Sequence, residues 1–267
     1  MSTTEPNATP ASAGLLRSAR QLLKRSGREK AGLFITEGVP TVREALLANR
    51  VKTLIVEDLT RYPELLELSD QVQVVTADAS ELAGLTDTVT NQGVVAICRT
   101  ETIQVAELPD QSNLVVICSQ IRDPGNAGTV IRCADAFGAD AVIFTTGSVE
   151  VTNPKTVRSS VGSVFHLPIV TGVPLADALD WARAEDLQIF AADARGRGID
   201  ELAEAGELRR PTAWVFGNEA WGFADIELGG AEIVSVPMWG RAESLNLSTA
   251  AAICLFSSAS EINKTTE

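Results

Sequence analysis

Short apolar segments that alternate with helical segments constrain the fold of this chain more than any other feature. In the C-terminal part, the pattern predicts strands over residues 114–118, 141–145, 189–192, 212–216 and 233–237. The spacing of apolar residues between and after them predicts helices over residues 128–136, 175–184 and 247–258. Strands that are apolar along nearly their whole length and alternate with helices are typical of a parallel sheet covered on both faces. The expected fold class is therefore α/β.

A smaller alternating series precedes this region. Apolar residues at helical spacing predict a helix over residues 15–28 whose other face is basic. Further predicted elements are strands over 33–36, 53–56, 72–76 and 93–99, and a helix over 40–49. Residues 100–113 are polar and contain turn-forming residues, so we interpret them as a linker. The predicted organisation is a flexible leader over residues 1–14, an N-terminal domain over 15–105 and a C-terminal domain over 112–267.

The composition restricts the class of protein further. A hydrophobic fraction of 45% with 21% charged residues describes a folded globular chain. No apolar run approaches the roughly 18 to 20 residues that span a bilayer, and the N-terminus lacks the features of a secretory or transit peptide. The cysteines are far apart and include no CxxC pair; they are Cys98, Cys118, Cys133 and Cys254. We expect reduced thiols of a cytoplasmic protein, with neither disulfides nor a metal site.

The charge is distributed unevenly along the chain. The formal net charge of −13 argues against binding to nucleic acid, because neutralisation of phosphates supplies most of that affinity. Between Leu15 and Lys52, however, nine basic residues stand against three acidic ones. A basic segment on an acidic body is able to hold a polyanion locally, and a solvated helix face is the alternative interpretation.

Polar and glycine residues gather directly after predicted strands, where ligands bind in open parallel sheets. The first such segment covers residues 123–132, in which Pro124, Gly125 and Gly128 form a turn that leaves a helix N-terminus open. Arg132 follows within that helix, and a helix N-terminus beside a guanidinium suits an anion or a nucleotide. The segment contains neither a dinucleotide fingerprint nor a P-loop. An ordinary turn with a surface arginine is the alternative.

Two further segments share this character. In residues 216–222, Glu219 lies between two glycines, which allow the backbone to approach a ligand closely. The alternative is a loop whose Asn218 and Glu219 cap the next helix, with Trp221 as a hydrophobic residue at the rim. Residues 236–248 end with three hydrogen-bonding side chains at a helix entrance, where capping requires only one.

Taken together, these segments resemble the three signature motifs of the SpoU/TrmH family, the SPOUT-class RNA ribose 2′-O-methyltransferases. The residues that carry the resemblance are Asn126, Gly128 and Arg132, then Gly217, Asn218 and Glu219, then Pro237, Met238, Ser244, Leu245, Asn246, Leu247 and Ser248. Residues 34–38 and 91–96 resemble the family's N-terminal substrate-binding domain, and residues 158–168 resemble its mid-domain segment. The resemblance extends over nearly the whole chain.

The resemblance implies methyl transfer from S-adenosylmethionine to a ribose 2′-hydroxyl of structured RNA, with rRNA favoured over tRNA. It also implies a SPOUT-type parallel sheet with a C-terminal trefoil knot, preceded by a small α/β substrate-binding domain. Family enzymes are homodimers, and the helix over 247–258 is a candidate for that interface or for the monomer core. A tRNA 2′-O-methyltransferase and a noncatalytic RNA-binding protein of the same fold are the alternatives. The missing glycine fingerprint disfavours a nucleotide-binding oxidoreductase.

The resemblance assigns roles to individual residues as well. The implied catalytic residues are Arg132, Asn126, Glu219, Ser244 and Asn246, and the implied cofactor-binding residues are Gly217, Val236, Met238 and Leu245. Arg132 would activate the hydroxyl, either with a substrate phosphate that helps the proton transfer or as a cation that stabilises the developing alkoxide. Asn126 would hold Arg132 or the ribose, and Glu219 would orient the catalytic loop. Ser244 and Asn246 would complete the polar wall near the ribose.

Basic residues are the expected contacts to the RNA backbone, which provide affinity without sequence information. They are Arg17, Arg20, Lys24, Arg25, Arg28 and Arg158. For Arg158 a solvent-facing salt bridge is the alternative. His166, the single histidine, lies in an apolar segment, so we expect a packing or hydrogen-bonding role for it rather than catalysis. Arg241 is assigned no role.

Overall fold

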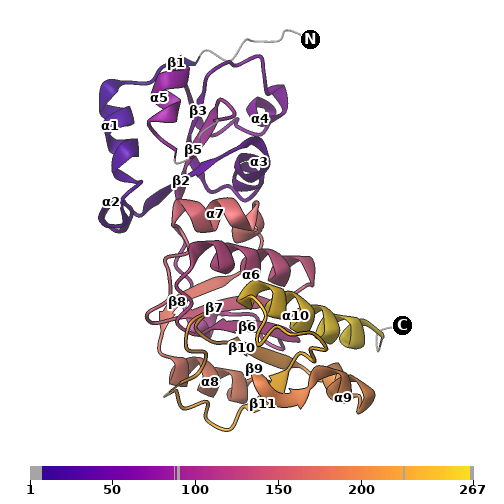
Figure 1. The fold of residues 1–267 in the computed structure, drawn as a ribbon. Helices are drawn as coiled ribbons and strands as arrows, with labels where there is room; N and C mark the ends of the chain where they lie inside the picture. Colours follow the sequence, from indigo (N-terminus) through magenta and orange to yellow (C-terminus); the bar gives the residue numbers. More distant parts are fainter. Residues whose placement is uncertain (1–7, 87, 89–90, 225, 265–267) are drawn as a thin grey trace. The chain divides into compact units, whose positions relative to one another are not determined.

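The computed structural model describes residues 8–86, 88, 91–224 and 226–264, which belong to two compact units (Figure 1). The N-terminal unit contains the described residues up to Glu101 together with Thr152–His166, and the C-terminal unit contains Thr102–Val151 and the described residues from Leu167 onward. Helix α7 (Pro154–Ser160) and the 3₁₀ turn η2 (Ser163–Phe165) therefore pack with the N-terminal unit, although they lie between two strands of the C-terminal sheet in the sequence.

The N-terminal unit is built on a five-stranded mixed sheet in the order β1-β4-β3-β5-β2. Its strands are β1 (Thr9–Pro10), β2 (Leu33–Glu37), β3 (Val51–Val56), β4 (Gln73–Thr76) and β5 (Val94–Arg99). Its other helices are α1 (Ala13–Gln21), α2 (Arg25–Ala31), α3 (Val39–Leu47), α4 (Pro63–Glu67) and α5 (Ala79–Ala83). Strand β5 runs antiparallel to both of its neighbours. Buried apolar residues of α1 pack against Ile35, Ile55 and Ile97 of the sheet to form a separate core.

Regular structure begins earlier in the chain than expected. Thr9 and Pro10 pair with β4, and the side chain of Ser12 accepts a hydrogen bond from the backbone N–H of Leu15 to cap α1. The prediction of a flexible leader up to Gly14 is therefore wrong for residues 9–14, because pairing with the distant strand β4 and a helix cap organise them. The part of that prediction that concerns residues 1–7 lies outside the described residues.

The single helix expected over residues 15–28 is wrong, since the chain forms α1 and α2 with a break between them. Arg28 causes the difference: it is only 4% exposed, and its Nη1 donates hydrogen bonds to the carbonyls of Leu22 and Leu23 at 2.9 and 3.0 Å. Gly27 permits the close approach, because a Cβ there would lie 2.0 Å from the carbonyl oxygen of Gln21. Arg28 therefore serves the fold, and its assignment to RNA contact is wrong.

We expect Arg28→Ala to destabilise the N-terminal unit by about 2 to 3 kcal/mol, because two buried carbonyls lose a charged donor. Chemical denaturation followed by circular dichroism measures the change. Arg25→Ala is the matched control, since Arg25 pairs with Glu29 on the surface of the same helix and we expect a change within about 0.5 kcal/mol. Equal effects of the two substitutions would contradict the structural role of Arg28.

The C-terminal unit confirms the α/β expectation. Its six strands form a fully parallel sheet in the order β11-β9-β10-β6-β7-β8. They are β6 (Leu114–Cys118), β7 (Ala141–Thr145), β8 (Ile169–Val173), β9 (Gln188–Gly198), β10 (Thr212–Phe216) and β11 (Glu232–Ser235). The helices are α6 (Pro124–Ala136), α8 (Leu175–Ala184), α9 (Ile199–Glu204) and α10 (Leu247–Lys264), with 3₁₀ turns η1 (Val105–Glu107) and η3 (Glu207–Arg209). Only β8, α9 and the 3₁₀ turns lie outside the predicted elements of this unit.

Helices cover both faces of this sheet, as Figure 1 shows for α6 and α10 on one side and α8 on the other. Successive side chains of β10 point to opposite faces of the sheet. Ala213 and Val215 pack into the cluster that contains α8, whereas Trp214 points toward α10 and donates a hydrogen bond from Nε1 to Ser258 Oγ at 2.9 Å. Every residue of β10 is buried, which explains its continuous apolar sequence.

Candidate active site

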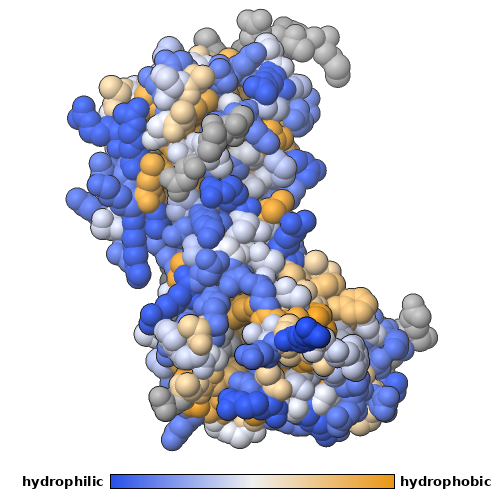
Figure 2. Space-filling view, in the orientation of Figure 1, coloured by the Kyte–Doolittle hydropathy of each residue, from blue (hydrophilic) through white to orange (hydrophobic). Residues whose placement is uncertain are grey.

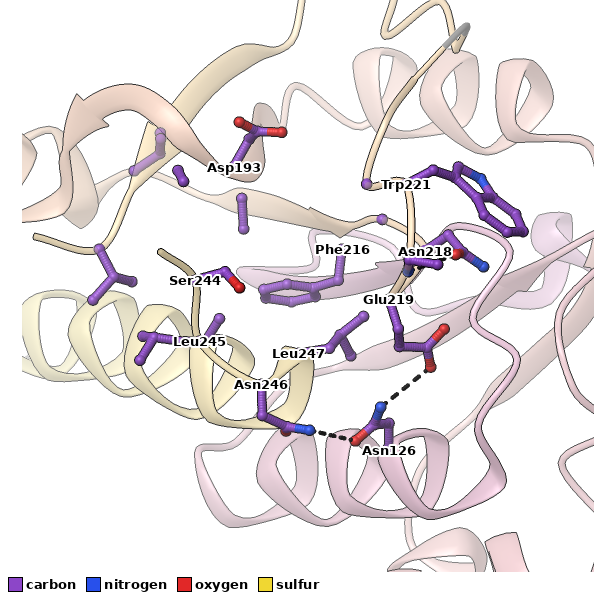
Figure 3. Close-up of a pocket in the computed structure, with 18 of the residues that line it drawn as sticks. Asn126, Asp193, Phe216, Asn218, Glu219, Trp221, Ser244, Leu245, Asn246 and Leu247 are labelled. Atoms are coloured by element: carbon purple, nitrogen blue, oxygen red, sulfur yellow. Dashed lines mark hydrogen bonds between the residues drawn. The ribbon is translucent and has the colours of Figure 1, made fainter. Parts of the chain in front are cut away.

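A cavity of about 600 Å³ lies at the carboxyl edge of the C-terminal sheet (Figure 3). Its wall contains residues 192–194 in the middle of β9, the turn after β10, the segment after β11 and the start of α10, together with Asn126 from α6. Parallel strands end at the same edge, so the loops that follow neighbouring strands meet there. The three segments singled out in the sequence therefore converge in space, as their expected function requires.

Eight of the nine expected catalytic and cofactor-binding residues line this cavity. They are Asn126, Gly217, Glu219, Val236, Met238, Ser244, Leu245 and Asn246. Apolar surface comes from Phe216, Leu245 and Leu247, whereas Asn126, Glu219 and Asn246 form a polar edge (Figure 3). An apolar wall with a small number of polar groups is the usual character of a small-molecule site.

The carboxylate of Glu219 joins the turn after β10 to the turn after β6. It accepts hydrogen bonds from the backbone N–H groups of Arg122 at 3.2 Å and Asp123 at 3.1 Å, and from Asn126 Nδ2 at 3.3 Å. Because β6 and β10 are neighbouring strands, the turn after β10 places the Glu219 carboxylate beside the first residues of α6 and holds them in position. The expectation that Glu219 orients the catalytic loop agrees with this geometry.

The alternative in which Asn218 and Glu219 cap a following helix is wrong. Asn218 and Gly222 exchange two backbone hydrogen bonds of 3.1 and 2.9 Å, which close a tight turn. In the described part of the chain, no helix lies between β10 and α10. Asn218 is buried and donates from Nδ2 to the carbonyl of Gln120 at 2.7 Å, so this turn has a second tether to the loop after β6.

A row of hydrogen bonds links the three segments across the cavity edge. Asn246 Nδ2 donates to Asn126 Oδ1 at 3.1 Å, and Asn126 in turn donates to Glu219 (Figure 3). The Oδ1 atom of Asn246 caps α10 by accepting from the backbone N–H groups of Ser248 and Thr249. Asn126 therefore accepts from Asn246 and donates to Glu219, and these two partners together fix the orientation of its amide.

Arg132 lies apart from this row. It is exposed on α6, does not line the cavity, and makes no hydrogen bond or ion pair within the described residues. Six residues separate it from Asn126, so the two side chains leave different faces of the helix. The expected contact between Asn126 and Arg132 is absent, because Asn126 is engaged by Glu219 and Asn246 instead. The catalytic role of Arg132 remains a prediction.

Asp193 is a residue of the cavity that the sequence reasoning missed. Its carboxylate accepts hydrogen bonds from the backbone N–H of Arg195 at 3.1 Å and from Arg195 Nε at 3.0 Å. The hydrogen bond from the Arg195 side chain lowers the pKa of Asp193, against the opposing effect of its partial burial. The available signal was its position directly after the predicted strand over 189–192, the same position that drew attention to Glu219.

Three of the four cysteine thiols of the chain are protected by burial. Burial raises the pKa of Cys98 and Cys254 to about 12, and it raises the pKa of Cys118 even more. Cys133 on α6 is only partly buried. Because the thiolate is the reactive form, we expect a thiol reagent at neutral pH to modify at most Cys133 in the native protein and all four cysteines after denaturation. Cys133→Ser should abolish the native reaction, and a second reactive thiol would contradict these environments.

The basic residues of the N-terminal unit are in different situations. Arg17, Arg20 and Lys24 are exposed on and just after α1, and Arg25 pairs with Glu29. Arg158 Nη1 forms an ion pair with Glu37 at 3.2 Å, which is the alternative that the sequence left open. His166 Nε2 lies 3.2 Å from Glu44 Oε2, so the hydrogen-bonding role expected for this histidine is confirmed.

The described residues contain neither a metal-binding cluster nor a membrane-spanning helix. No group of three or more histidine, cysteine, aspartate or glutamate side chains is placed to hold a metal ion in the ranges that the structure describes. In the same ranges, no helix has both the length and the apolar character needed to cross a bilayer.

Fold and site together define a class of protein. The C-terminal unit is a parallel α/β domain whose strand ends close a cavity of nucleoside size, edged by a tethered row of amide and carboxylate side chains. Comparison with family profiles agrees with this class: the profile described as the SpoU rRNA Methylase family matches residues 113–256, and the MRM3-like substrate binding domain matches residues 15–96. The chain belongs to the SpoU rRNA methylase family.

Individual relatives cover nearly the whole chain. The 23S rRNA (guanosine(2553)-2′-O)-methyltransferase RlmP of Bacillus subtilis is 34% identical over 240 residues, which is 89% of this chain and 92% of the relative. The crystal structure of an AdoMet-bound rRNA methyltransferase from Sinorhizobium meliloti has a TM-score of 0.80 at 27% identity and covers 94% of this chain and 96% of its own. The SpoU methyltransferase AviRb from Streptomyces viridochromogenes, in complex with AdoMet, has a TM-score of 0.80 at 26% identity, covering 94% and 98%.

Proposed function

We propose that this protein transfers a methyl group from S-adenosylmethionine to a ribose 2′-hydroxyl of ribosomal RNA. The observation that carries the proposal is the row from Asn246 through Asn126 to Glu219, which joins the family's three motifs at the edge of one cavity. Relatives that span nearly the whole chain are rRNA methyltransferases by name, and two of the similar solved structures contain AdoMet.

The cavity is large enough for the cofactor. Its volume of about 600 Å³ has room for the adenosine and for the rest of the molecule, and the backbone around Gly217, Val236 and Leu245 is able to hydrogen-bond the base and ribose, with Met238 alongside. Gly217 packs directly against the end of its own turn, since a Cβ there would lie only 2.7 Å from the carbonyl oxygen of Gly222. Asp193 contributes a carboxylate to the same cavity, and its ion pair with Arg195 balances that charge.

The chain's own residues position the acceptor and assist the loss of its proton to a substrate phosphate or to solvent. Asn126 and Asn246 form the polar edge beside the cavity, with Ser244 on the same wall, and they hold the ribose there. The bound cofactor supplies an electrophilic methyl group. Arg132 assists loss of the hydroxyl proton, either together with a substrate phosphate that accepts the proton or as a permanent cation beside the developing alkoxide. Alignment of hydroxyl and methyl group supplies much of the rate acceleration.

The remaining expectations concern domains and assembly. Residues 15–105 serve as the RNA substrate-binding domain through Arg17, Arg20 and Lys24, and residues 112–267 carry catalysis, with a C-terminal trefoil knot as in the family. The protein acts in the cytoplasm as a homodimer. Figure 2 shows apolar residues gathered over α6 and α10 on one face of the C-terminal unit, and Phe256 there is 57% exposed beside Phe137. Analytical ultracentrifugation tests the dimer.

The test of the proposed activity is methyl transfer from labelled S-adenosylmethionine to separated rRNA and tRNA, followed by nucleoside analysis. We expect label in a 2′-O-methylated nucleoside of rRNA. Label in tRNA would favour the alternative substrate, and label on a base would contradict the reaction. RNA binding without any label would favour the noncatalytic alternative.

A further inference from the structure

We propose that Trp221 and Arg122 form a stacking site for the base of the acceptor nucleotide, so that the protein methylates a nucleotide whose base is unpaired and turned out of its helix. This inference rests on the proposed function and extends it to the local structure of the RNA. It starts from an aromatic side chain that the fold does not require.

Trp221 lies at the cavity and keeps 41% of its surface exposed. Trp214, seven residues earlier, shows how this chain uses an indole for packing: it is fully buried, and its ring N–H is hydrogen-bonded to Ser258. Trp221 has neither feature within the described residues. A large apolar ring left at the rim of a binding cavity is more useful for contact with a ligand than for stability.

The loop that carries Trp221 is held in place, so the ring occupies a defined position. The turn from Asn218 to Gly222 is closed by two backbone hydrogen bonds, and Asn218 and Glu219 each tie it to the loop after β6. Trp221 lies next to these two residues at the edge of the cavity (Figure 3). A preorganised aromatic surface loses little conformational freedom when a base stacks on it.

Arg122 adds a cation to this surface. Its guanidinium carbon lies 4.8 Å from the centre of the Trp221 ring, which is the distance of a cation–π contact. The backbone N–H of the same Arg122 donates to Glu219, so one carboxylate positions both the loop that carries the ring and the loop that carries the cation. Aromatic rings and arginine planes are the groups on which proteins stack unpaired RNA bases, and arginine also attracts phosphate.

The position of Trp221 relative to the row of Asn246, Asn126 and Glu219 determines which base of the RNA is bound. Glu219 contacts Asn126, where the proposed function places the acceptor ribose, and Trp221 follows Glu219 by two residues. Because Trp221, Glu219 and Asn126 all line the same cavity, we assign the base attached to that ribose to the ring. A base that stacks on a protein side chain has left the stack of its own helix, which explains the requirement for an unpaired acceptor. Stacking tolerates any base, so this site supplies affinity rather than base identity.

The test compares Trp221→Leu with Trp221→Phe. Leucine keeps apolar contact without an aromatic face, whereas phenylalanine keeps the face. For a 23S rRNA transcript carrying the mapped nucleotide, we expect Trp221→Leu to raise the KM at least about tenfold and Trp221→Phe to change it less than about threefold. Calorimetric affinity for S-adenosylmethionine should stay within about twofold of the parent value for both variants, because backbone groups form the nucleoside site. Fluorescence anisotropy of the labelled transcript with S-adenosylhomocysteine measures binding without turnover.

A second transcript that is abasic at the acceptor position isolates the stacking contact. On this RNA we expect Trp221→Leu and the parent protein to bind equally. An equal affinity of Trp221→Leu and the parent for the intact transcript would overturn the stacking site, as would a loss that persists on the abasic transcript. Methyl transfer by the parent protein together with unchanged binding by Trp221→Leu would reject the stacking site alone, whereas absence of methyl transfer by the parent would reject the proposed function and the stacking site with it.

Discussion

Replacing Arg132 with alanine should lower methyl transfer about 100-fold or more and leave the affinity for S-adenosylmethionine within about twofold of the parent value. Arg132 is exposed, does not line the cavity and contacts none of its residues, so its removal leaves the cofactor site intact. It lies on α6, the helix whose first turn carries Asn126. An RNA strand bound at Asn126 is able to contact the guanidinium of Arg132. The substitution removes this positive charge from the place where negative charge develops on the ribose oxygen.

Single-turnover methyl transfer and calorimetry with the cofactor measure these two quantities. Arg241→Ala is the control, because Arg241 is an exposed arginine of the third motif to which no role is assigned. We expect it to retain activity within about threefold. Activity of Arg132→Ala equal to that of the control would reject Arg132 as the catalytic arginine, and a parallel loss of cofactor affinity would reassign it to binding.

Gly217→Ala should weaken S-adenosylmethionine binding at least about tenfold, since an added Cβ must displace the turn that forms the cavity wall. The ideal Cβ position at Gly217 lies 2.7 Å from the carbonyl oxygen of Gly222 and 3.0 Å from the ring of Phe223. The first of these is backbone, held by the hydrogen bonds that close the turn, so it is not free to move aside. The same displacement would shift Glu219 and thereby the entrance of α6.

Gly240→Ala provides a matched control for this substitution. Gly240 belongs to the segment after β11, and a Cβ there would meet no atom within 4 Å. We expect calorimetric cofactor affinity and thermal stability close to those of the parent protein. Unchanged affinity in Gly217→Ala would show that the turn after β10 does not form part of the cofactor site.

The two substitutions probe features that the sequence revealed to different degrees. Strands β6, β7 and β10 and helix α8 have the predicted boundaries, because their apolar pattern follows directly from burial on both faces of the sheet. Strand β8 was missed because Ile169–Val173 lies at the edge of the sheet, where only one of its residues is fully buried. Helix α7 was missed because it packs with the N-terminal unit, a contact that no local pattern encodes.

The candidate site divides in the same way. Residue types indicated Glu219 after a strand and Asn246 at a helix entrance, whereas Asn126 was implied by the resemblance to the SpoU/TrmH family; parallel strands bring the loops that follow them to one edge. The hydrogen bonds from Asn246 through Asn126 to Glu219 span 120 and 93 residues, and they became evident only in the structure. The same holds for the outward position of Arg132, the anionic group of Asp193 in the cavity and the contact of Arg122 with Trp221.

The sequence by itself determined the α/β class, most of the C-terminal strands and the segments that form the cavity, since burial and turn chemistry are local properties of a chain. The tertiary structure alone decided which side chain meets which. Arg28 illustrates the difference: its sequence indicates a surface cation, yet its guanidinium is buried against the carbonyls at the end of α1. Side-chain partners depend on how distant backbone segments pack, and that packing depends on residues throughout the chain rather than on the residues around any one position.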